Sequence, residues 1–315
     1  MKMNKKIVIA TGGTGGHVFP AYSLAQNFLK KKYFVDIIID ERGKKYLKKD
    51  DRINLKIINS KTIFKKNIFE IFYGIAIITK AFIQSYIYFL KSRPKIVFGM
   101  GGYSSFPACV AAKFLGIPFI IYENNLFLGK TNKYLLPFAL KIFVAYSELE
   151  GIKKKYNFKI IKTGNIIRQE IINFDQDAIK SENIKILVLG GSQAAKIFGE
   201  KLPIIFKKCK SNNISLKIYQ QCTPDQNSIL EKQYLNEKID FELFNFSENI
   251  LEYFLKVNLV ITRAGSSMMA ELLNCNIPFI SIPLPSSADG HQIKNAKYFE
   301  KKGYSFLINE KELEE

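Results

Sequence analysis

The protein has 315 residues, which is more than one ordinary hydrophobic core and predicts two domains of about 150 residues each. Its two histidines, His17 and His291, are too few for a histidine-rich metal site. Its four cysteines form no C-x-x-C pair, which is typical of free thiols in a reducing compartment.

The positive charge of the chain lies in one half. Residues 1–168 contain 30 Lys and Arg against 9 Asp and Glu, a net +21, whereas residues 169–315 contain 17 against 19, a net −2. A compositional drift toward lysine would explain abundant lysine but not a neutral second half. The asymmetry indicates that the first domain faces an anionic surface, either a membrane or a nucleic acid.

The chain begins with a predicted strand that runs into a glycine-rich loop. Residues 6–10 (KIVIA) are an apolar run shorter than the roughly 7 to 15 residues of a signal peptide, and TGGTGGH follows at 11–17. The loop does not fit G-x-G-x-x-G, because Val18 stands at the third glycine position, which disfavours a nicotinamide or ATP site. Four glycines let a bulky group approach the backbone N–H groups, with His17 at the entrance of the predicted helix. The alternative is a helix-terminal histidine without a role.

Strands predicted at 35–39 and 55–58 continue a strand and helix alternation that indicates a parallel sheet. Three interpretations compete for the apolar segment 64–90 that follows. A membrane span is disfavoured because Lys80 interrupts its middle, where a lysine costs roughly 3 kcal/mol. A core helix needs one apolar stripe, yet apolar residues occupy nearly every face. We favour core packing combined with an apolar patch that docks on a membrane surface.

Two further glycine loops follow predicted strands. The strand at 95–98 leads into GMGGYSSFP at 99–107, and the strand at 184–189 leads into GGSQAA at 190–195. Because two of the three glycine loops belong to the first half, we expect a binding site at the carboxyl ends of a parallel sheet in that domain.

The segment 259–295 has the most informative order of features. It reads as a buried strand, a Gly/Ser turn that opens a helix, a second buried strand and a polar loop. The N–H groups of Gly265, Ser266 and Ser267 at the helix start suit a phosphate, and Glu271 is placed to accept hydrogen bonds from a ribose. An ordinary helix cap with a solvated glutamate is the alternative on spacing alone.

Together these motifs resemble the MurG family, the UDP-N-acetylglucosamine transferases that complete the lipid-linked peptidoglycan precursor on the cytoplasmic side of the bacterial membrane. The resemblance rests on five separated motifs in family order, which include Gly12-Gly-Thr-Gly-Gly-His17, Gly101-Gly-Tyr103, Gly190-Gly-Ser-Gln193, Arg263-Ala-Gly265 with Glu271, and His291-Gln292. It implies an α/β fold of GT-B type, with two doubly wound Rossmann-like domains facing across a cleft. Residues 1–162 would face acceptor and membrane, and residues 163–315 would bind the UDP-sugar and lack the family's final helices.

The implied activity is inverting transfer of N-acetylglucosamine from UDP-N-acetylglucosamine to the 4-hydroxyl of undecaprenyl-diphospho-N-acetylmuramoyl-pentapeptide (lipid I), which gives lipid II. His17 is the implied general base and an acceptor contact. The implied donor contacts are Thr14, Gly15, Gly16, Asn125, Arg168, Ser192, Gln193, Phe246, Ser247, Ala264, Gly265, Ser266, Glu271, His291 and Gln292. The other implied acceptor contacts are Gly13, Gly101, Gly102, Tyr103, Ser104 and Glu123.

The resemblance also implies a peripheral protein on the cytoplasmic face of the inner membrane, bound to its anionic surface, with no metal or cofactor required. The implied membrane patch comprises Phe64, Lys65, Lys66, Phe69, Phe72, Ile75 and Phe82.

The chain departs from the family pattern at Tyr122, Asn124, Ile166 and Ala194. The alternatives are another UDP-sugar-dependent lipid glycosyltransferase, a UDP-sugar epimerase of the same fold, or a non-catalytic basic protein that binds membrane or nucleic acid. Nucleic acid is not expected as a partner, because the lysines scatter through loops and no zinc spacing or RNP-type aromatic motif is present.

Overall fold

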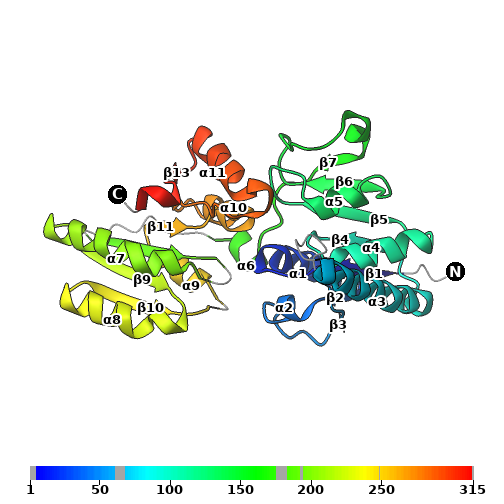
Figure 1. Cartoon of the computed structure of the whole chain (residues 1–315), viewed down its shortest axis with the longest axis horizontal. Coiled ribbons are helices and arrows are strands. Elements are labelled where there is room, and N and C mark those ends of the chain that lie inside the picture. The colour runs from blue at the N-terminus through cyan, green and yellow to red at the C-terminus, as the bar shows by residue number, and fades with distance from the viewer. Residues whose placement is uncertain (1–4, 61–67, 175–182, 192–193, 248, 314–315) are drawn as a thin grey trace. The chain divides into compact units, whose positions relative to one another are not determined.

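The computed structural model describes residues 5–60, 68–174, 183–191, 194–247 and 249–313. The chain forms two compact units, Met1–Arg168 and Gln169–Glu315 (Figure 1). Each unit contains one parallel sheet between helices, as the strand and helix alternation predicts.

The first unit has a seven-stranded sheet in the order β3-β2-β1-β4-β5-β6-β7, and every pair is parallel. The strands are β1 Lys6–Ala10, β2 Phe34–Ile39, β3 Ile53–Ile57, β4 Ile96–Gly99, β5 Phe119–Glu123, β6 Lys141–Val144 and β7 Ile160–Lys162. The helices are α1 Gly15–Lys30, α2 Glu41–Lys44, α3 Ile68–Ser92, α4 Ser105–Phe114 and α5 Lys130–Leu135, with a 3-10 helix at Lys154–Lys159.

Helices cover both faces of this sheet. Val18, Ala21 and Ala25 of α1 pack into one core, whereas α3, α4 and α5 pack into a second core on the other face. The short apolar strands carry residues of both cores because side chains alternate between the faces of a strand. The result is a doubly wound domain, in which the strand order reverses between β1 and β4.

The second unit repeats this plan with six parallel strands in the order β10-β9-β8-β11-β12-β13. The strands are β8 Ile184–Leu189, β9 Leu216–Gln221, β10 Asp240–Phe244, β11 Leu259–Thr262, β12 Phe279–Ser281 and β13 Phe306–Leu307. The helices are α6 Gln169–Ile172, α7 Lys196–Ser211, α8 Asn227–Asn236, α9 Leu251–Phe254, α10 Ser266–Asn274 and α11 His291–Lys301, with 3-10 helices at Pro224–Gln226, Ala288–Gly290 and Glu310–Leu313. Here the strand order reverses between β8 and β11.

The division between the units follows Arg168 rather than the expected residue 162. Hydrogen bonds tie the intervening segment to the first sheet: the Thr163 N–H donates to the Val144 carbonyl at 3.0 Å, and the Ile166 N–H donates to the Tyr122 hydroxyl at 3.0 Å. The first sheet also contains a seventh strand that the sequence did not predict, β7, which pairs with β6 and ends at Lys162.

Candidate active site

The first glycine loop is anchored by a buried carboxylate at the end of the neighbouring strand. The Gly13 and Gly43 N–H groups both donate to Asp40 Oδ1 at 2.9 Å, and the Arg42 guanidinium donates to Oδ2. Burial raises the pKa of Asp40, but the hydrogen bonds from Gly13, Arg42 and Gly43 outweigh it and hold that pKa below its ordinary value. Asp40 thus stays ionised and fixes the loop that precedes α1.

Asp40 was not among the residues selected from the sequence. The only signal was an acidic residue directly after a buried apolar strand, which by itself does not show what the carboxylate binds.

His17 packs against the second glycine loop, which joins β4 to α4. A Cβ atom added at Gly101 would lie 3.0 Å from His17 Cε1, and one at Gly102 would lie 3.4 Å from His17 Cδ2. Both glycines have positive φ, 86° and 73°, so glycine suits this loop in conformation as well as in size. The backbone of His17 is held in turn, because the Thr11 hydroxyl donates to its carbonyl at 3.0 Å. The structure therefore brings together two loops that lie more than 80 residues apart in the sequence.

The remaining predicted residues of this half lie on the same two loops. Thr14 caps α1 and is exposed with Gly16, whereas Gly15 is buried in its first turn. Tyr103 is partly buried, and Ser104 is buried, with its hydroxyl accepting from Ser60 at 2.9 Å. This hydrogen bond helps to hold the second glycine loop, and the contact of Ser104 with an acceptor stays a prediction.

A third loop, after β5, is organised by Glu123. Its carboxylate is buried and accepts from the Asn125 N–H and amide, from the Gly129 N–H at 2.9 Å and from the Asn132 amide at 2.9 Å. Glu123 therefore shapes the loop that carries Asn125, and its contact with the acceptor stays a prediction. Asn124, one of the departures from the family pattern, donates to the Gly16 carbonyl at 3.2 Å and so links this loop to the start of α1.

Arg168, the last residue of the first unit, is also held near α1. Its guanidinium lies over the ring of Phe19, 5.0 Å from the centroid, and its side chain is buried. Such a cation–π contact holds the planar guanidinium beside the aromatic ring. The contact of Arg168 with a diphosphate stays a prediction.

In the second unit the loop after β8 requires glycine at position 190 and has a strained backbone at Ala194. A Cβ atom at Gly190 would overlap the backbone of Ala194 and Ala195, so only glycine fits there. Ala194, which stands in place of the family's glycine, has φ of 56°. A left-handed alanine costs roughly 1–2 kcal/mol. Ser192 and Gln193 lie outside the described residues.

The turn from β11 opens α10 at the predicted place, and anion binding there stays a prediction. Gly265 has extended backbone and caps α10, whose first N–H groups have no partner within the helix. The Ala264 carbonyl accepts from the buried Asn295 amide of α11 at 3.3 Å, which holds the turn in place. Ser266 is buried at the helix start, and Glu271 lies on the same helix with 3% of its surface exposed.

Arg263, the first residue of this turn, braces the fold. Its guanidinium donates to the Ile282 carbonyl at 3.2 Å, pairs with Glu310 and lies 4.6 Å from the ring centroid of Phe198. Arg263 of the family motif Arg-Ala-Gly therefore has a structural role, and the contact of the turn with a ligand stays a prediction.

The other predicted donor contacts lie at the start of α11 and in the loop after β10. Gln292 accepts from the Leu284 N–H at 2.9 Å, and His291 contacts the Ala288 carbonyl through Nδ1 at 2.6 Å. A glutamine amide also carries N–H donors, which suits a sugar hydroxyl. Phe246 is exposed after β10, and the Ser247 hydroxyl accepts from the Asn249 N–H at 3.2 Å.

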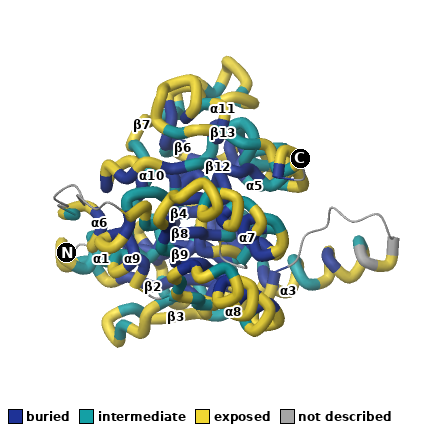
Figure 2. Tube along the Cα trace, turned by 90° about the vertical axis from the view of Figure 1, so that its left-hand side faces the viewer, coloured by how far each residue is buried: buried dark blue, intermediate teal, exposed yellow. Residues whose placement is uncertain are grey.

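The long helix α3 combines a narrow buried stripe with a broad exposed apolar surface (Figure 2). Ala81, Ser85 and Phe89 are buried, while Phe69 and Phe72 are 80% and 65% exposed. The predicted patch residue Ile75 is exposed as well. One helix among the described residues, Ile71–Ser92, is long and apolar enough to cross a membrane, which alone is weak evidence that it does.

The predicted patch needs one correction. Phe82 is only partly exposed, because its ring packs edge-on against Phe114 at 5.6 Å and lies near Tyr86. Phe82 therefore joins the core to the surface. Phe64, Lys65 and Lys66 fall outside the described residues.

Among the residues that the structure describes, no group of three or more His, Cys, Asp or Glu side chains is arranged to hold a metal ion. Catalysis without a metal remains a prediction.

Glycine-rich loops and helix starts at the carboxyl ends of two doubly wound sheets define a two-domain nucleotide-sugar enzyme of GT-B type. The N-terminal domain of glycosyltransferase family 28 matches residues 7–144, and the C-terminal domain of that family matches residues 185–315. The chain belongs to glycosyltransferase family 28 and, within it, to the MurG family.

Named relatives support this assignment. A UDP-N-acetylglucosamine--N-acetylmuramyl-(pentapeptide) pyrophosphoryl-undecaprenol N-acetylglucosamine transferase of Pelagibacter ubique (strain HTCC1062) is 38% identical over 99% of this chain and 87% of its own. The protein of the same name from Rickettsia canadensis (strain McKiel) is 37% identical over 94% of this chain and 83% of its own.

Solved structures agree on the fold. The crystal structure of Acinetobacter baumannii MurG superposes with a TM-score of 0.73 at 27% identity, covering 98% of this chain and 86% of that one. A putative UDP-N-acetylglucosamine 2-epimerase of Listeria monocytogenes gives a TM-score of 0.63 at 14% identity, covering 98% of this chain and 86% of that one. At that identity the epimerase shows only that the fold is shared.

Proposed function

We propose that this glycosyltransferase moves N-acetylglucosamine from UDP-N-acetylglucosamine to the 4-hydroxyl of lipid I and so forms lipid II for peptidoglycan. The observation that carries the proposal is the 38% identity, over 99% of the chain, to a relative named for this reaction. The loop geometry supports it, because the glycine loops and the Arg-Ala-Gly turn follow the carboxyl ends of strands in their own sheets.

The second unit would bind the donor. The N-terminus of α10 would hold the diphosphate, because it offers N–H donors and positive potential to negative oxygens, and the positive charge of Arg168 would add to this potential. Glu271 would accept hydrogen bonds from the ribose, and Gln292 would donate to the sugar hydroxyls. Ser247 and Phe246 would contact the uracil.

The first unit would bind the acceptor and remove its proton. His17 would take the proton from the 4-hydroxyl as that oxygen bonds to the anomeric carbon. The bond from this carbon to UDP then breaks on the opposite side, so the configuration inverts and UDP leaves with the additional negative charge. The α10 N-terminus and Arg168 would stabilise that charge. The packing of His17 against Gly101 and Gly102 supports this role, because it fixes the imidazole where the two loops meet.

The first unit would also place the enzyme on the cytoplasmic face of the inner membrane as a peripheral protein. Exposed Phe69, Phe72 and Ile75 on α3 would enter the interface, and the net +21 of residues 1–168 would attract anionic lipids.

The test is UDP release by the purified chain, measured with UDP-N-acetylglucosamine alone and with a water-soluble analogue of lipid I. Release that depends on the acceptor, with a disaccharide product, is the expected result. Conversion of the donor without acceptor would favour an epimerase-like reaction, and UDP binding without turnover would contradict the transferase proposal.

A further inference from the structure

An apolar pocket lies between α4 and α5 of the first unit, and the proposed reaction uses none of its residues. Its volume is 370 Å³, within the range of roughly 300–1,000 Å³ that is usual for small-molecule sites. Phe114 ends α4 and Phe119 begins β5, so the pocket lies toward the amino ends of the strands. The glycine loops lie at the carboxyl ends, which makes this a separate site.

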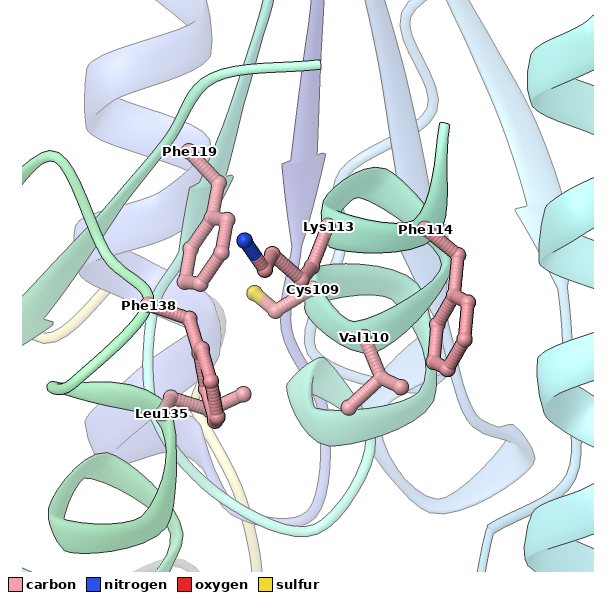
Figure 3. Close-up of a pocket in the computed structure, with 7 residues that line it drawn as sticks. All are labelled: Cys109, Val110, Lys113, Phe114, Phe119, Leu135 and Phe138. Carbon is pink, nitrogen blue, oxygen red and sulfur yellow. The ribbon is translucent and has the colours of Figure 1, made fainter. Parts of the chain in front are cut away.

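The pocket is apolar apart from one cation. Figure 3 shows Cys109 and Val110 of α4 facing a space that Leu135 and Phe138 close from the side of α5. Lys113 extends from α4 toward Phe119, and its ammonium group lies 5.6 Å from the ring centroid of Phe138. A pocket of this kind suits a molecule with an apolar chain and a negatively charged end.

The apolar surface continues outside the pocket. Phe114, Phe138, Leu140 and Phe158 are 72%, 58%, 54% and 71% exposed. A second, smaller hollow shares Val110 and Phe114 with the pocket and is lined on its other side by Ile78, Thr79 and Phe82 of α3. The apolar surface thus runs from the pocket to the helix proposed to dock on the membrane.

Positive charge gathers at the same place. The Lys159 ammonium donates to the carbonyls of Leu136, Pro137 and Ala139, which flank Phe138, and Lys141 donates to the Phe158 carbonyl at 2.9 Å. Burial and the nearby charges of Lys113 and Lys141 lower the pKa of Lys159. Residues 105–162 contain nine lysines and three acidic residues, so an anion beside the pocket would relieve this repulsion.

We propose that the pocket takes one acyl chain of an anionic phospholipid, whose headgroup lies against Lys113, Lys141 and Lys159. This inference rests on the proposed membrane docking and goes further, because it names a lipid-binding site apart from the α3 patch. A chain withdrawn from the bilayer into the pocket gives the docked enzyme a defined orientation, which a surface patch alone does not.

The chain contains no tryptophan, so a single introduced tryptophan reports on one place. Phe138→Trp puts this reporter in the pocket wall, and Phe158→Trp puts it on the exposed surface nearby as a matched control. Each variant is mixed with vesicles of phosphatidylglycerol brominated in the middle of its acyl chains, which quench nearby tryptophan fluorescence. We expect much stronger quenching for Phe138→Trp, and weak quenching for both with brominated phosphatidylcholine.

Further substitutions test the two parts of the site. Lys113→Glu in the Phe138→Trp background should raise the lipid concentration for half-quenching by more than about fivefold, the contribution of one lysine near an anionic surface. Lys31→Glu, at the exposed end of α1, should change it little. Val110→Phe should fill the pocket and remove the difference between the reporters.

The outcomes distinguish failure of the pocket site from failure of the proposed membrane docking or of the proposed transfer reaction. Equal quenching of the two reporters on vesicles that bind the protein would mean surface insertion only and would overturn the pocket site. Equal quenching of Phe138→Trp by the neutral lipid would overturn the role of the lysines. If the protein did not float with vesicles, membrane docking and the pocket site would both be refuted. Turnover of the soluble acceptor tests transfer independently and confirms that the variants are folded.

Discussion

Gly101→Ala tests whether catalysis depends on the contact between His17 and the second glycine loop. The new Cβ would lie 3.0 Å from His17 Cε1 and 3.1 Å from Nδ1, closer than such atoms normally approach, so the imidazole must shift by a few tenths of an ångström. Because a misplacement of about 1 Å costs about 100-fold in rate, we expect kcat to fall about tenfold. Positive φ adds a stability loss of roughly 1–2 kcal/mol.

Gly116→Ala is the matched control. Gly116 also has positive φ, 68°, but a Cβ there would meet nothing within 4 Å. Urea unfolding should show similar losses of stability for both variants, whereas transfer to a soluble acceptor should fall only for Gly101→Ala. Equal turnover of the two variants would refute the reasoning that His17 must be held by this loop.

Three further predictions concern single residues. Asp40→Ala leaves two loop N–H groups without their acceptor and should cost about 3–5 kcal/mol in urea unfolding, whereas Asp40→Asn should cost less. Since the folded-state pKa of Asp40 is lowered, its contribution to the free energy of unfolding is present above pH ~4 and is lost as pH falls through that pKa. If the wild type remained more stable than Asp40→Asn at lower pH, this reasoning would be contradicted. Ala194→Gly should raise the free energy of unfolding by about 1 kcal/mol, and a loss would show that the left-handed alanine is not strained. His17→Ala should lower kcat by about 10²–10⁴-fold with UDP binding unchanged, while unchanged turnover would place the general base elsewhere.

The sheets were largely predictable because parallel strands are short buried apolar runs. The predicted strand at residues 6–10 coincides with β1, and the helix predicted at His17 is α1. β7 was missed because it has only three residues and is half exposed, so it reads as a linker.

The site was predictable only in part. Glycine loops after strands are local features, so their positions could be read from the sequence. The role of Asp40 depends on β2 lying beside β1, which brings its carboxylate to Gly13 across 27 positions of sequence. The loop around Glu123 depends in the same way on a turn that returns Gly129 and Asn132 to the carboxylate. Such partners follow from tertiary pairing and not from residue type.

The loops after β1, β2 and β4 also limit how this domain can be recombined with its relatives. A side chain at Gly12 would meet both Ser104 and Asp40, and one at Gly102 would meet the Gly12 carbonyl. The three loops are therefore packed so closely that the shape of each depends on the other two. A chimera that exchanges a single loop with a relative would bring in a surface shaped for different neighbours, whereas the three loops transplanted together would keep their fit.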